Sequence, residues 1–205
     1  MLKYWYDTEF IEDGHTIDLV SIGIVAEDGR ELYAQVAEAD YSKASEWVSK
    51  NVLGQLLPCV KYPAFPHDPG TPDYHLGWSI HRGQIGKIDG KWVHCTEETC
   101  PWRKRYELQL DLLAFCDPAQ YGKPEFWAYY ADYDHVALCQ LFGRMIDLPK
   151  GWPMYTRDIK QWCDMLGNPR LPKQEGYEHN ALADARWNKQ AWEFLENYKR
   201  SDFFD

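Results

Sequence analysis

The sequence predicts an α/β protein, and three observations lead to this fold class. Strand-like segments near the N-terminus are separated by Asp-Gly turns, a nearly all-apolar segment in the second half is followed by a helical pattern, and a long helical pattern lies near the C-terminus. At 205 residues the chain is long enough for one hydrophobic core, or for one core with an insertion.

The first three strand-like segments are residues 2–10, 18–26 and 31–36. The first is rich in aromatic residues, as buried strands are. An Asp-Gly pair lies between each segment and the next, and such pairs are typical of tight turns. Three strands joined by short turns predict an antiparallel meander.

A helix is expected after the meander. Ser42 is a candidate N-cap for a helix that runs to about Val52, with Ala44, Trp47 and Val48 also on its apolar side.

The regular pattern breaks between Pro58 and Pro101, where closely spaced prolines and glycines exclude a long helix or strand. We expect an inserted flap at about residues 60–100. It holds most of the histidines and half of the cysteines: Cys59, His67, His75, His81, His94, Cys95 and Cys100. Zinc binding is one interpretation, but the spacing is irregular and no Cys-x-x-Cys pair occurs, so a loop without zinc is favoured.

Helical spacing resumes over residues 103–116, which open with the basic cluster Arg103-Lys104-Arg105. A solvated helix start is the favoured interpretation of this cluster, and a phosphate contact is the alternative.

Residues 125–131 predict a strand buried on both faces, followed by a helix. Asp132 is the better candidate to cap that helix, which leaves Asp134 in the first turn free for chemistry. An acidic residue at the carboxyl end of a strand lies where open α/β sheets place ligand sites. A short strand over 153–158 and a helix over 159–166 are expected next.

The last helix is predicted to follow Asn180 as its N-cap and to run to about Lys199. His179 then lies in a mobile loop just before the helix, and Asp184 lies one turn inside it. In one continuous helix these two side chains would be about 140° apart around the axis. The loop position of His179 removes that difficulty.

Asp7 and Glu9 are two residues apart on the first strand, so both carboxylates point to one face. Their repulsion requires a shared proton, a basic partner or a bound cation. With Asp134 and Asp184 they form four hard oxygen ligands suited to Mg²⁺ or Mn²⁺. Two such ions about 3.5–4 Å apart can hold the attacking and leaving oxygens of a phosphoryl displacement. A neutral His179 can take the proton from the attacking water.

Three short motifs, Asp7-Thr8-Glu9, Tyr133-Asp134 and His179-x4-Asp184, resemble those of the DEDD exonuclease superfamily, and the five-residue step from His to Asp resembles its DEDDh subgroup. Longer segments resemble the polyadenylate-specific 3′-exoribonuclease AS family. These segments are residues 6–14, 19–23, 26–31, 133–141 and 169–172. The resemblance covers nearly all of the chain outside the flap.

This resemblance implies an RNase H-like fold, with a mixed five-stranded sheet flanked by helices, in a single exonuclease domain over residues 1–205. It implies two divalent ions, Mg²⁺ or Mn²⁺, held by Asp7, Glu9, Asp134 and Asp184, with His179 as general base. The expected reaction is hydrolysis of single-stranded RNA from the 3′ end to nucleoside 5′-monophosphates, with poly(A) tails as a candidate substrate. The resemblance also implies a homodimer.

The formal net charge of −10 is a poor match to a protein that coats long nucleic acid, but it is compatible with an enzyme that holds a few nucleotides at metal ions. No apolar run approaches the ~20 residues of a membrane span, and no signal peptide is recognisable, so we expect a cytoplasmic protein with no membrane partner.

Two alternatives stay open: the same chemistry on single-stranded DNA, and a non-catalytic RNA-binding protein on the same fold. The motifs do not choose between RNA and DNA, because that choice depends on a contact to the 2′-hydroxyl.

Overall fold

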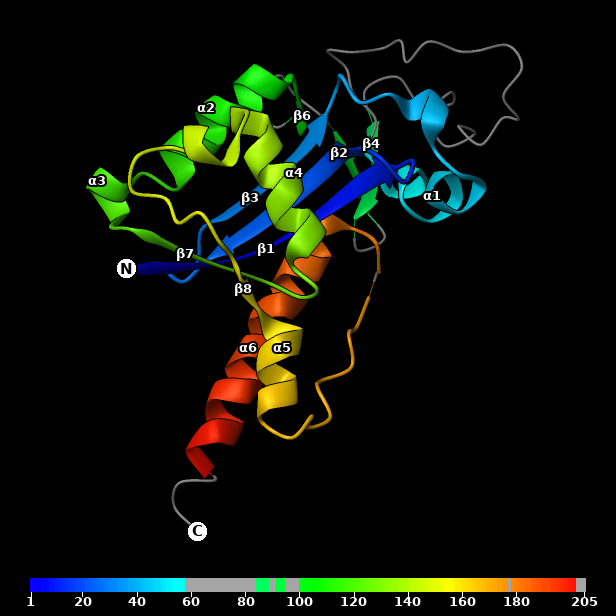
Figure 1. Cartoon of the computed structure of the whole chain (residues 1–205). Helices are drawn as coiled ribbons and strands as arrows, with labels where there is room; N and C mark the ends of the chain where they lie inside the picture. The colour runs from blue at the N-terminus through cyan, green and yellow to red at the C-terminus, as the bar shows by residue number, and fades with distance from the viewer. Residues whose placement is uncertain (58–83, 89–90, 95–99, 177, 202–205) are drawn as a thin grey trace.

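The computed structural model describes residues 1–57, 84–88, 91–94, 100–176 and 178–201. Its main sheet has six strands in the order β6-β3-β2-β1-β7-β8 (Figure 1). The strands are β1 (Leu2–Glu12), β2 (Ile17–Ala26), β3 (Glu31–Val36), β6 (Trp102–Arg103), β7 (Pro124–Ala128) and β8 (Arg157–Asp158). The α/β class is therefore confirmed, but the expected count of five strands is wrong. The two-residue strand β6 extends the sheet beside β3, and so short a strand carries no periodicity that sequence can reveal.

The sheet is mixed, as the resemblance implied. Strands β1, β2 and β3 form the predicted antiparallel meander. Strand β7 runs parallel to β1, β8 runs parallel to β7, and β6 runs parallel to β3. Strand β1 therefore lies near the middle of the sheet.

Helices cover both faces of the sheet (Figure 1). The helices are α1 (Glu46–Asn51), α2 (Arg105–Phe115), α3 (Pro118–Tyr121), α4 (Asp132–Phe142), α5 (Ile159–Met165) and α6 (Ala181–Ser201), with 3₁₀ turns η1 (Tyr41–Lys43), η2 (Leu53–Gln55) and η3 (Met145–Asp147). Side chains of β1 alternate between the two faces. Tyr4 and Tyr6 pack in one buried cluster with residues of α2 and α4, whereas Trp5 packs in another with residues of α5 and α6.

Helix α1 begins later than predicted. Its N-cap is Ser45, whose hydroxyl accepts a hydrogen bond from the backbone N–H of Val48 at 3.2 Å. Ser42, the expected cap, lies in η1 and donates to the Asp40 carboxylate instead. Trp47, expected on the apolar side, is 54% exposed.

The prediction that Asp132 caps α4 is also wrong. Strand β7 ends at Ala128, the chain turns through Tyr130 at a φ of 56°, and Ala131 is the N-cap. The Ala131 N–H donates to the Asp158 carboxylate at 2.7 Å, so another segment of the chain stabilises this helix start. The Asp132 side chain is exposed.

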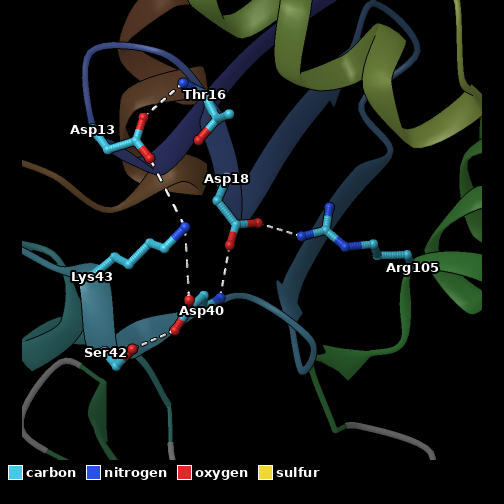
Figure 2. A network of polar contacts seen from close by, with 7 residues as sticks. All are labelled: Asp13, Thr16, Asp18, Asp40, Ser42, Lys43 and Arg105. Carbon is cyan, nitrogen blue, oxygen red and sulfur yellow. Dashed lines mark hydrogen bonds and ion pairs between the residues drawn. The ribbon is translucent and has the colours of Figure 1, made fainter.

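Two of the three side chains of the basic cluster pair with the chain's own acids. Arg103 pairs with Asp111 at 2.6 Å, and Arg105 of α2 pairs with Asp18 of β2. Figure 2 shows how Asp18 also accepts the backbone N–H of Asp40, at 2.7 Å. These contacts support the interpretation of the cluster as a helix start, and they tie the start of β2 to α2.

The predicted flap lies mostly outside the described residues. Strands β4 (Gln84–Ile88) and β5 (Lys91–His94) within it pair antiparallel. The candidate zinc ligands Cys59, His67, His75, His81 and Cys95, and the side chain of His94, lie outside the described part of the chain, while Cys100 is buried. Within the described ranges, no helix is both long enough and apolar enough to cross a bilayer.

Candidate active site

A cavity of about 970 Å³ opens where β1, α1, α4, α6 and the segment before α6 meet. All five residues proposed for the site from the sequence line this cavity: Asp7, Glu9, Asp134, His179 and Asp184. Four separate elements of the chain therefore bring the three motifs together at one place.

Strand β1 presents two of the carboxylates. Because side chains alternate along a strand, Asp7 and Glu9 lie on the same face as Trp5, which packs against α6. Thr8 lies between them on the other face, toward α4. Asp7 and Glu9 therefore face the helix that carries Asp184.

Helix α6 supplies the third carboxylate at close range. One oxygen each of Asp7, Glu9 and Asp184 lie within 4.8 Å of one another. Gln174, in the segment before α6, donates a hydrogen bond to Oδ1 of Asp184. This arrangement leaves three carboxylate oxygens close enough to share one cation.

Asp134 approaches the same cavity from α4. Its Oδ1 accepts two hydrogen bonds from Thr8, from the backbone N–H at 2.8 Å and from the hydroxyl at 2.6 Å. Asp134 is not a member of the three-oxygen cluster, although it is 95% buried beside it. The structure thus groups three of the four predicted ligands tightly and places the fourth at their edge.

The carboxylates are held in an environment that disfavours their charge. Burial, and then repulsion from Asp184 and Asp134, raises the pKa of Glu9 to about 8. Burial, followed by repulsion from the other three carboxylates, raises the pKa of Asp7 well above its usual value. Burial raises the pKa of Asp134 to about 6, although the Thr8 hydrogen bonds oppose the shift. Burial also raises the pKa of Asp184.

Burial raises the pKa of Asp184 by more than the charge of His179 lowers it, so this pKa stays raised. None of the described residues that line the cavity is a lysine or an arginine. The cluster therefore needs either protons or a cation from solution to exist at neutral pH.

His179 lies immediately before α6, as predicted. Its backbone φ is +66°, and Asn180 caps the helix by accepting the N–H of Ala183 at 3.1 Å. The imidazole packs edge-on against Trp47, with ring centroids 4.7 Å apart. The carbonyl of Glu178 accepts a hydrogen bond from Gln55, so the loop that carries His179 is attached to the η2 turn.

Sequence reasoning missed four residues that support the site: Thr8, Trp47, Gln174 and Asn188. Thr8 lies within the Asp7-Thr8-Glu9 motif, and strand alternation indicates that its side chain faces away from the two carboxylates. Asn188 lies four residues after Asp184, a spacing that places both on one side of a helix. Trp47 was interpreted as core, and no local pattern marks Gln174.

The fold and this carboxylate cluster define an α/β protein with a candidate divalent-cation site, and comparison with known proteins narrows that class. Residues 91–195 match the family model described as 3′-5′ exoribonuclease Rv2179c-like domain. Two curated proteins of Mycobacterium tuberculosis, 3′-5′ exoribonuclease Rv2179c of strain H37Rv and 3′-5′ exoribonuclease MT2234.1 of strain CDC 1551, are each 40% identical to the chain over 185 residues. Each alignment covers 90% of this chain and 88% of the relative.

The chain belongs to the Rv2179c-like 3′-5′ exoribonuclease family.

Proposed function

We propose that the protein is a metal-dependent 3′-5′ exoribonuclease that shortens single-stranded RNA, such as poly(A) tails, to nucleoside 5′-monophosphates in the cytoplasm. The observation that carries the proposal is the cluster of Asp7, Glu9 and Asp184 oxygens within 4.8 Å, in a chain of this family. The short motifs and this cluster also support assignment to the DEDDh group with an RNase H-like fold.

The donor set fits a hard divalent cation. Asp7, Glu9, Asp134 and Asp184 offer only carboxylate oxygens, which Mg²⁺ and Mn²⁺ prefer. Two such ions would supply positive charge to the scissile phosphate and lower the pKa of a bound water. The raised pKa values of Glu9 and Asp7 fit this role, because a bound cation replaces the proton that each group otherwise holds.

The protein's own side chains orient the reactants. His179 faces the cavity and would accept the proton of the attacking water as general base. The cavity walls also carry partly exposed aromatic side chains, among them Trp47, Tyr130 and Tyr133. Aromatic faces of this kind bind unpaired bases by stacking, which favours a single-stranded substrate.

Single-stranded DNA is the second candidate substrate, since stacking and metal ligation do not involve the 2′-hydroxyl. RNA is favoured because both relatives are named exoribonucleases. A non-catalytic RNA-binding role is disfavoured, because repulsive carboxylates would destabilise a protein that never bound a cation.

We further propose that residues 1–205 form one domain, with an insertion at about residues 60–100, that assembles as a homodimer. Buried clusters on both faces of a single sheet support the first statement. Light scattering coupled to size-exclusion chromatography tests whether the protein is a homodimer.

A degradation ladder tests the reaction. Oligomers of A, C and U labelled at the 5′ end, as RNA and as DNA, are incubated with Mn²⁺, Mg²⁺ or EDTA. Stepwise shortening of RNA that requires the metal, fastest for oligo(A), is the expected result. Equal shortening of DNA and RNA would contradict the assignment of RNA as the preferred substrate. Absence of any metal-dependent shortening would contradict catalysis and favour the non-catalytic RNA-binding role. Asp184→Asn, which keeps the shape and removes a ligand charge, is expected to lower the rate by orders of magnitude.

A further inference from the structure

The edge of β1 that faces β7 is open beside the carboxylates. Pairing between the two strands ends at Trp5 with Trp127, whereas β1 continues to Glu12 and remains paired with β2 on its other side. Within the described part of the chain, the residues of β1 beyond Trp5 therefore have no paired residue on β7. Buried backbone groups without a partner are costly, so side chains are expected to replace the missing strand.

Two side chains do so, one from each face of the sheet. The Thr8 N–H donates to Asp134 of α4 at 2.8 Å. The Tyr6 carbonyl accepts from Nδ2 of Asn188 of α6, also at 2.8 Å. Asn188 is 1% exposed and Tyr6 is fully buried, so water does not compete for this hydrogen bond.

Each of these contacts fixes a proposed metal ligand. At Asp134, one oxygen takes both hydrogen bonds from Thr8, which leaves the other oxygen for a cation. Asn188 lies one helical turn after Asp184, and it is bonded to the residue that precedes Asp7. The contact therefore sets how closely the turn of α6 that carries Asp184 approaches Asp7.

We propose that Thr8 and Asn188 are positioning residues of the metal centre. Thr8 orients Asp134, and Asn188 fixes how closely Asp184 approaches Asp7. The ligands from β1, α4 and α6 therefore meet at the open edge of β1. This inference rests on the proposed function. Residues that orient metal ligands in this way typically affect metal affinity by about 10- to 100-fold.

The test measures Mn²⁺ binding without RNA, by following the electron paramagnetic resonance signal of free Mn²⁺ during titration of the full chain. Thr8→Val removes the hydroxyl at constant shape, and Thr8→Ser retains it. Asn188→Leu removes the amide donor. Thr156→Val is the matched control for Thr8, because its hydroxyl donates to the Phe126 carbonyl outside the cavity. Asn197→Leu, at an exposed position of α6, is the control for Asn188.

Thr8→Val and Asn188→Leu are each expected to raise the Mn²⁺ dissociation constant by about 10-fold. Thr8→Ser and both controls should stay within about two-fold of the parent protein. If a variant at either position binds Mn²⁺ like the parent while its unfolding midpoint falls, its residue has only a structural role and the inference is overturned there. If Thr8→Val does not fold, Thr8→Ala removes the same hydroxyl without crowding and takes its place.

Measurements of Mn²⁺ binding and RNA hydrolysis by the parent protein distinguish a failure of this inference from a failure of the proposed function. A parent that binds Mn²⁺ but shortens no RNA contradicts the exoribonuclease proposal, and the variants still decide the roles of Thr8 and Asn188. A parent that binds no Mn²⁺ overturns both.

Discussion

Gly23 of β2 lies directly against Ala181, the first residue of α6, with no space for a side chain between them. A Cβ at Gly23 would lie 2.3 Å from the carbonyl oxygen of Ala181 and 2.4 Å from Cα of Leu182. Gly23 is also paired in register with Asp7. The start of α6 therefore rests on the strand pair that carries the first carboxylate, and this close approach brings Asp184 within reach of it.

Substitution of Gly23 by alanine is expected to displace the start of α6 and to disturb the carboxylate cluster. The atoms that an added Cβ would meet are backbone atoms, which cannot rotate away. We therefore expect destabilisation of about 1–3 kcal/mol and at least a ~10-fold loss of RNA hydrolysis. Denaturant unfolding and the ladder assay measure the two effects. Gly54→Ala is the matched control, since its nearest contact would be 3.9 Å. Parent-like activity of Gly23→Ala would show that α6 tolerates the shift.

The metal-free protein is expected to lose stability as the pH rises from about 5 to about 8. The unfolded chain releases the Glu9 proton near pH 4.5, whereas the folded protein retains it up to about pH 8. Asp134 behaves similarly between 3.8 and about 6. Because the folded state binds more protons across this range, the free energy of unfolding falls with rising pH.

Thermal unfolding in EDTA, at a series of pH values, measures this trend. Mg²⁺ or Mn²⁺ should raise the midpoint more at pH 8 than at pH 5, since cation binding to these carboxyls releases protons. The Glu9→Gln variant has no ionisable group at this position. Its unfolding midpoint in EDTA should therefore fall less steeply with rising pH than that of the parent protein. A midpoint in EDTA that is constant across the range would contradict the protonated cluster.

Local sequence patterns predict two parts of the site. Asp7 and Glu9 follow from strand alternation, and the position of His179 before a helix capped by Asn180 follows from local rules, so these features were predicted correctly. The meander and the bounds of β3 follow from local turn chemistry in the same way.

Features that depend on contacts between distant segments could not be predicted. Asp132 has a side chain suited to capping, but the helix start is bonded instead by Asp158, which lies 27 residues after the N-cap Ala131. The sixth strand exists only because residues 102–103 happen to lie beside β3. Trp47 has an apolar side chain typical of a core, yet its position opposite His179 depends on where α1 lies relative to the loop before α6.

His179→Ala is expected to separate proton transfer from metal binding. His179 lines the cavity, but it is not among the clustered oxygen ligands. Loss of a general base typically lowers the rate by about 10²- to 10⁴-fold. Single-turnover RNA hydrolysis should fall by this order, while the Mn²⁺ dissociation constant stays within about two-fold of the parent value. If His179→Ala abolished Mn²⁺ binding, the imidazole would be a ligand and its assignment as base would be wrong.

Trp47→Ala is expected to lower kcat because the indole supports the His179 ring. The two rings meet nearly at right angles, at 79°, with centroids 4.7 Å apart, an arrangement favoured for aromatic pairs. Removal of the indole leaves the imidazole free to rotate away from the reacting water, so we expect kcat to fall by about 10-fold and Trp47→Phe to restore most of it. Tyr106→Ala is the matched control, because Tyr106 is similarly exposed, at 55%, but lies on α2 outside the cavity. Steady-state kinetics on oligo(A) separate this role from base stacking: a change confined to KM, with kcat intact, would assign Trp47 to substrate binding instead.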